Sequence, residues 1–157
     1  MRKFNLLILF FLAIVNINGC EKKKIGEAEK IHWDRDMCER CKMAVSDRKF
    51  AFEIIDPKSG KVYKFDDIGC GILWLEEEQI PWREKAIMWV TDAKTGKWLN
   101  AKKALYTDDS ITPMAYGFAA YSQETKPKNK KLYDFNYIKK MTFKIEQFNN
   151  NQLKAQK

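Results

Sequence analysis

The sequence predicts an α+β fold made of two small, related ββαβ units that share one core. Two observations support this prediction: strand-like and helix-like segments alternate after a charged N-terminal segment, and similar strings recur about 70 residues apart. The expected organisation is a signal peptide at 1–19, a flexible tether at 20–32, a domain at 33–148 with units at about 33–96 and 97–148, and a frayed tail at 149–157.

The first nineteen residues have the pattern of a bacterial secretory signal. Arg2 and Lys3 give a positive start, and the apolar run that follows, residues 6–15, is too short to span a bilayer. The string Ile-Asn-Gly-Cys that ends at Cys20 resembles a lipobox, in which the leader is cut before a cysteine that is then acylated. An ordinary signal with a chance cysteine is the alternative. We expect a protein of the bacterial cell envelope, lipid-anchored at Cys20 and facing the periplasm.

The first unit is expected between residues 33 and 96. Its elements are predicted in order as a strand at 50–55, a turn at 56–60, a strand at 61–65, a helix at 68–78 and a strand at 86–91. Asp66 and Asp67 precede an apolar run and are typical of a helix cap, although two carboxylates could also bind a hard metal. The run is apolar almost all round, which predicts a buried helix.

The second unit is inferred from an internal echo. The matching pairs are Lys61–Ile68 with Lys131–Ile138, Phe50-Ala51 with Phe118-Ala119, and Met43-Ala44 with Met114-Ala115. Each match is short, but the three keep one order and offsets between 68 and 71, which indicates a duplicated unit. A polar segment at 123–130 is expected to be a loop, and residues 137–148 to form a terminal helix.

The net charge of +8 is unevenly distributed along the chain. Basic and acidic residues balance between Cys20 and Ser122, at 18 each, whereas residues 123–157 hold nine lysines against three acids. An exported domain that is neutral apart from a basic end does not indicate nucleic-acid binding. The single histidine, His32, argues against hydrolase triads, so we expect a binding protein rather than an enzyme.

Soft donor atoms gather in one short segment. Cys38 and Cys41 are three residues apart, and Met43 adds a thioether two residues later. Thiolate and thioether sulfur together favour Cu(I), whereas zinc prefers thiolate and imidazole. A thioether has no proton to lose, so such a site would hold copper with less charge than a thiolate cage and would release it more readily to a partner. This pattern predicts a Cu(I) carrier.

Four segments of the sequence resemble the NosL family. They are Cys41-Lys42-Met43, Phe65–Cys70, Trp89–Trp98 and Thr112–Phe118, within a likeness that runs from about Trp33 to Tyr121. The resemblance implies two related ββαβ units and a membrane-anchored, copper-binding accessory factor for nitrous oxide reductase, and hence a partner in that enzyme or its maturation proteins.

The resemblance also implies ligands. The family's Cys-x-Met pair corresponds to Cys41 and Met43, and its later methionine corresponds to Met114. The duplication supports Met114 independently, because equivalent loops of two units meet near a shared axis; core packing is the alternative. This chain departs from the family pattern with Lys42, where glycine is usual, and with the additional thiols of Cys38 and Cys70.

Two other functions are compatible with the sequence. Cys38 and Cys41 could form a disulfide, and an envelope thiol-disulfide protein would use the same pair. A structural zinc lipoprotein could use Cys38, Cys41, Cys70 and His32. For Cys70 itself, ligand, disulfide partner and core thiol are all possible, and the glycines on either side of it favour the core.

Overall fold

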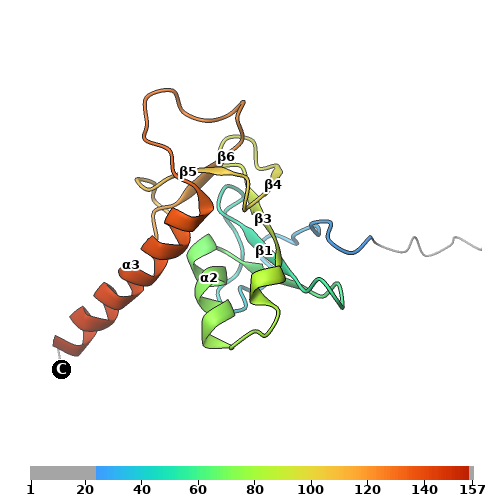
Figure 1. Cartoon of the computed structure of the whole chain (residues 1–157), viewed down its shortest axis with the longest axis horizontal. Helices are drawn as coiled ribbons and strands as arrows, with labels where there is room; N and C mark the ends of the chain where they lie inside the picture. Colours follow the sequence, from blue (N-terminus) through green and yellow to red (C-terminus); the bar gives the residue numbers. More distant parts are fainter. Residues whose placement is uncertain (1–23, 156–157) are drawn as a thin grey trace, which may run out of the picture.

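The computed structural model describes residues 24–155, so the predicted signal peptide and Cys20 lie outside the described residues. Its elements are β1 (Phe52–Ile55), β2 (Val62–Phe65), α2 (Ile68–Glu77), the short 3-10 helix η1 (Arg83–Lys85), β3 (Ile87–Thr91), β4 (Trp98–Asn100), β5 (Leu105–Thr107), β6 (Ala119–Tyr121) and α3 (Phe135–Ala155). The α+β class is confirmed, with two antiparallel sheets and two α-helices among these residues (Figure 1).

The first unit has the predicted ββαβ order. A four-stranded sheet runs β2-β1-β3-β4, and α2 packs against β1 and β2. Gly71 on α2 allows this close approach, because a Cβ there would lie 2.4 Å from the Phe52 ring. All residues of α2 from Ile68 to Leu75 are buried, as the apolar pattern predicted.

The second unit does not have the predicted order. β5 and β6 form a two-stranded sheet, and Tyr133 extends it by one antiparallel bridge to Tyr106 before α3 begins. No strand follows α3 within residues 24–155, so the prediction of a second ββαβ unit is wrong. The physical reason is that Tyr133, which precedes α3 in the chain, pairs with β5 and occupies the position beside that strand.

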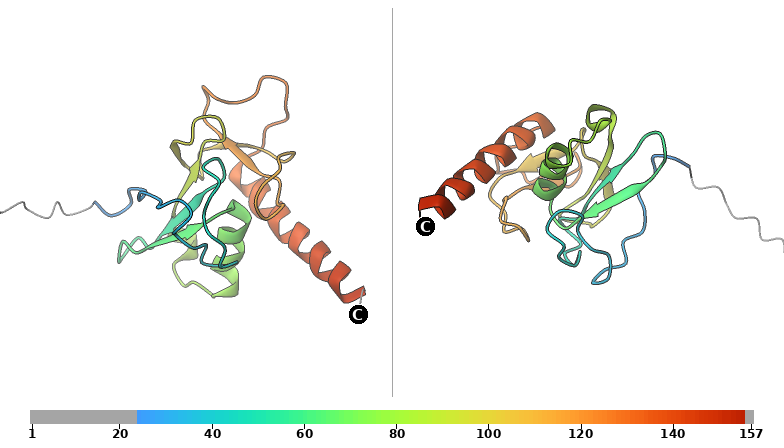
Figure 2. Two further views of the ribbon diagram at one scale, coloured as in Figure 1. Left: turned by 180° about the vertical axis from the view of Figure 1, so that it is seen from behind. Right: turned by 90° about the horizontal axis from the view of Figure 1, so that it is seen from below.

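The two halves of the chain share one hydrophobic core. β4 lies beyond the expected unit boundary at 96/97 but pairs with β3, and the backbone of Ala93 donates to the carbonyl of Ala120 on β6. α2 also contacts α3. The views in Figure 2 show α3 crossing beside α2 and then projecting away from the sheets.

Both flanks of the domain differ from expectation. α3 continues through residues 149–155, where the sequence suggested a frayed tail. The described part of the tether, residues 24–32, lies against the first sheet instead of extending freely: Trp89 Nε1 donates to the Gly26 carbonyl at 2.8 Å, and Ile31 is buried. Among residues 24–155, no helix has the length and apolarity needed to cross a membrane.

Candidate metal centre

The loop that carries Cys38 and Cys41 is a tight turn closed by backbone hydrogen bonds. Met37 and Ala44 form an antiparallel bridge, and the Cys38 amide donates to the Met43 carbonyl at 2.8 Å. The Glu39 amide donates to the carbonyl of Lys64 at 2.9 Å, which fixes the turn beside β2. The two thiols are therefore held at the end of β2 from which α2 begins.

Lys42 closes this turn in the left-handed region, with φ at +59°. A side chain with a Cβ is disfavoured there, whereas glycine is not. The left-handed backbone at Lys42 therefore explains why glycine is usual at this position in the NosL pattern that the sequence resembles.

Lys42→Gly is expected to raise the free energy of unfolding by about 1 kcal/mol, because it removes the left-handed strain of a residue that has a Cβ. Lys42→Ala is the matched control, since it removes the same charge but keeps the Cβ. Urea denaturation of both variants measures the difference. Equal stability of the two would contradict the strain at this turn.

The second part of the site is the junction between β2 and α2. Asp67 is the N-cap of α2 and accepts from the Gly69 amide at 3.0 Å, so the predicted cap is confirmed. Asp67 Oδ2 also accepts from the Thr112 hydroxyl at 2.6 Å and from the Met114 amide at 3.3 Å, and this docks the loop at 112–117 onto the helix start. Cys70 lies in the first turn of α2 and is fully buried.

Four side chains from these two parts converge. One ligand atom from each of Cys38, Cys41, Asp66 and Cys70 lies within 4.8 Å of all the others. The Cys41 thiol is 3.5 Å from both carboxylate oxygens of Asp66. Cys38, Cys70 and Asp66 are buried, whereas Cys41 is partly exposed, so solvent reaches the cluster on the Cys41 side. The three thiols are free.

Hydrogen bonds favour one thiolate in this cluster. The Cys70 side chain lowers the pKa of Cys38 to about 7 by donating to its sulfur, and the backbone amides of Asp66 and Cys41 also stabilise the Cys38 thiolate. Burial raises the pKa of Cys41 to about 12. The hydrogen bond to Cys38, together with burial, raises the pKa of Cys70 as well. A second thiolate beside the Cys38 thiolate and Asp66 is therefore costly unless a cation is bound between these groups.

The predicted ligands occupy different places relative to this cluster. Cys38, Cys41 and Cys70 are brought together, as described above. Met43 directs its backbone amide to the Cys41 sulfur, but the residue is 52% exposed. Met114 is partly buried against the core, and its backbone contacts Asp67. His32 lies outside the cluster and is next to Asp36, with 61% of its side chain exposed.

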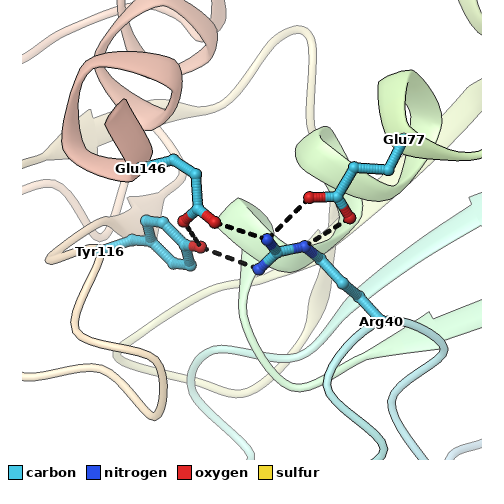
Figure 3. A network of polar contacts seen from close by, with 4 residues as sticks. All are labelled: Arg40, Glu77, Tyr116 and Glu146. Atoms are coloured by element: carbon cyan, nitrogen blue, oxygen red, sulfur yellow. Dashed lines mark hydrogen bonds and ion pairs between the residues drawn. The ribbon is translucent and has the colours of Figure 1, made fainter. Parts of the chain in front are cut away.

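Arg40, between the two cysteines of the turn, connects that turn to both helices (Figure 3). Its guanidinium donates to Glu77 on α2 through two nitrogens, each at 2.8 Å, and to Glu146 on α3 at 2.7 Å. It also donates to the Tyr116 hydroxyl at 3.1 Å, and that hydroxyl donates to Glu146 at 2.8 Å. Because α2 also carries Cys70, the Arg40–Glu77 pair fixes the position of the turn relative to the third thiol.

Neither Asp66 nor Arg40 was predicted from the sequence to belong to the thiol site. Asp66 was assigned to a helix cap together with Asp67, and only Asp67 makes the cap. The sequence does not indicate which of the two carboxylates caps the helix and which joins the thiols, although Asp66 precedes Cys70 by four residues. Arg40 makes contacts with residues 37 to 106 positions away, which local patterns do not reveal.

These features define the class of the protein as a small antiparallel α+β domain with a candidate metal site of three thiols and one carboxylate. No protein-family model matches the sequence, and no curated protein sequence is similar to it. The fold is similar to the crystal structure of the copper chaperone NosL from Shewanella denitrificans, with a TM-score of 0.55 and 17% identity over 71% of this chain and 94% of that one. The expected NosL-like fold is therefore confirmed, and the similar structure is that of a chaperone, not an enzyme.

Proposed function

We propose that this protein is a Cu(I) carrier that holds the ion on the thiolates of Cys38, Cys41 and Cys70. The observation that carries the proposal is the convergence of these three sulfurs within 4.8 Å of one another. Sulfur ligands favour Cu(I), and backbone amides directed at the Cys38 and Cys41 sulfurs stabilise their anionic forms. Cys41 is the partly exposed member of the set and the point at which a recipient can reach the ion.

The proposed role is that of a copper chaperone for the copper sites of nitrous oxide reductase, with that enzyme or its maturation proteins as recipient. The fold shared with a copper chaperone and the sequence resemblance to the NosL family support this role. In the same proposal, Cys20 is acylated and anchors the protein in the cell envelope, facing the periplasm.

Cu(I) titration tests the proposed metal directly. The reduced protein with Cys20→Ser is expected to take up one Cu(I) and to retain it against weak Cu(I) chelators, because three soft donors meet at a single site. Loss of the ion to such chelators, or a clear preference for zinc under the same conditions, would contradict the copper assignment.

A structural zinc site is the second candidate, and Asp66 is the observation that favours it. Three thiolates and one carboxylate make a four-donor set that suits tetrahedral zinc, and Asp66 takes the place that the sequence had given to His32. The thiol-disulfide alternative has less support. The pKa of Cys38 is lowered, as thiol exchange requires, but Cys38 is fully buried, and the pKa of the accessible thiol, Cys41, is raised.

Asp66→Asn separates copper from zinc. The amide keeps the shape of the side chain but removes the carboxylate, a hard oxygen donor that contributes little to Cu(I). We expect Cu(I) affinity to change by less than about tenfold and Zn(II) affinity to fall by more than that. The readout is a pair of competition titrations on one preparation. A larger loss for copper than for zinc would assign Asp66 to the copper site and count against the trithiolate.

Met43 is proposed as a thioether donor at the exposed side of the cluster, and Met37 provides its matched control. Both residues are about half exposed, at 52% and 51%, so leucine at either position should leave stability nearly unchanged. Met43→Leu is expected to weaken Cu(I) binding, whereas Met37→Leu is not. Equal affinities of the two variants would remove Met43 from the ligand set.

A further inference from the structure

The segment from Lys24 to Ile31, here called the strap, is bound at its beginning to the turn between β1 and β2. Ile25 packs on Gly60 in that turn, where a Cβ would lie 3.2 Å from the Ile25 side chain. Gly26 lies against the Ile87 side chain, and its carbonyl accepts the hydrogen bond from Trp89 described above. The first residues of the strap are thus fixed at one end of the sheet.

The strap then runs to the opposite end of the sheet. The Glu29 amide donates to Glu53 at 2.8 Å, and Lys64 Nζ donates to the carbonyl of Lys30 at 3.2 Å. Ile31 is buried in the core. Lys64 is also the residue whose carbonyl holds the Cys38–Cys41 turn, so the strap ends beside the metal centre.

The strand register shows that these two ends are opposite. Ile55 pairs with Val62 next to the β1–β2 turn, and Phe52 pairs with Phe65 at the end where α2 and the cluster begin. In Figure 1 and in the left view of Figure 2, the described N-terminal segment leaves on the same side as the β1–β2 turn. From Lys24 to Ile31, the strap therefore passes the β1–β2 turn first and the metal centre last.

We propose that the strap orients the anchored domain, with the β1–β2 turn facing the anionic headgroups of the membrane and the metal centre facing away, toward an aqueous recipient. This inference rests on the acylation of Cys20 in the proposed function. Cys20 and Lys24 are only four peptide units apart and can be separated by at most about 14 Å, so the turn is held close to the lipid.

The chemistry of the turn region fits that surface. Lys24, Lys58 and Lys61 are exposed there, and Ile25 is 58% exposed beside them. Basic side chains are attracted to anionic phospholipid headgroups, and an exposed apolar residue can enter the interface. The recipient is then a protein that approaches from the aqueous side and contacts the Cys41 face.

Lysine footprinting tests the orientation. The acylated protein is bound to vesicles of phosphatidylethanolamine and phosphatidylglycerol, treated with a water-soluble acetylating reagent, and compared with the Cys20→Ser protein in solution. Lys58 and Lys61 are expected to react several-fold more slowly on vesicles. Lys42, on the metal turn with a side chain that is 69% exposed, is the internal control and should react at the same rate in both samples.

Equal protection of Lys42 and Lys58 would overturn the orientation, as would full reactivity of Lys58 and Lys61 in the anchored protein. A variant with a flexible glycine-serine insertion between Lys23 and Lys24 keeps the strap but lengthens its connection to the anchor, and it is expected to lose the protection. Retained protection would contradict the role of the short connection.

The intact mass reports acylation of Cys20, and the absence of the acyl mass would overturn the anchor. Cu(I) titration on the same vesicles reports the metal separately, so a failure to bind copper would contradict the proposed function and leave the orientation standing.

Discussion

Arg40→Met is expected to lower the free energy of unfolding of the metal-free protein by roughly 2–3 kcal/mol. Arg40 is mostly buried, with 17% of its side chain exposed, and Glu146 is 24% exposed, so the change leaves a poorly hydrated carboxylate and the Tyr116 hydroxyl without their cation. Glu77 is 48% exposed and is solvated after the change, which keeps the cost below that of a fully buried pair. Urea denaturation measures the loss.

The matched control is Arg83→Met. Arg83 pairs with Glu76 at 3.5 Å, and both side chains are about 40% exposed, so the same substitution should cost less than about 1 kcal/mol. The Arg40 variant should also bind Cu(I) more weakly, since the turn loses its attachment to the helix that carries Cys70. Equal stability losses at Arg40 and Arg83 would contradict the structural role of this network.

Cys70→Ala is expected to lower Cu(I) affinity by more than about a hundredfold, a larger loss than follows from replacing a residue that only orients a ligand. Cys70 is fully buried and hydrogen-bonded to Cys38, so its removal takes one donor from the cluster. Alanine leaves no unsatisfied hydroxyl in the core, and metal-free folding is expected to be kept. Competition titration with a Cu(I) chelator gives the affinity.

Ile138→Val is the control for Cys70→Ala. Ile138 is fully buried on α3, and the change should cost about 1 kcal/mol of stability with no effect on copper. If Cys70→Ala lost only stability and kept its copper affinity, Cys70 would be the core thiol that its flanking glycines suggested, and the cluster would reduce to Cys38 and Cys41.

The first unit could be predicted because its signals are local. The Asp67 cap, the apolar run after it and the turn at 56–60 each fix an element within a few residues, and the structure has those elements in the predicted order. The second unit could not be predicted in the same way. Its strands have only three residues each, and the bridge of Tyr133 to Tyr106 depends on a tertiary contact that the internal echo does not specify.

The candidate site was predicted in part for a similar reason. The spacing of Cys38 and Cys41 marked the turn from the sequence alone, but whether Cys70 joins them depends on where α2 docks. That docking depends on the packing of Gly71 against Phe52 and on the Arg40–Glu77 hydrogen bonds. Both contacts join residues that are far apart in the sequence. Asp66 was missed because a carboxylate before a helix has a simpler explanation as a cap.

X-ray absorption at the copper edge of the Cu(I)-loaded protein identifies the atoms bound to the metal, and so it tests whether three thiolates hold the ion. A copper site of three thiolates should show sulfur neighbours only, and fewer of them when Cys70 is replaced by alanine. A first shell of nitrogen and oxygen, or a sulfur shell unchanged by Cys70→Ala, would contradict a copper site built from Cys38, Cys41 and Cys70.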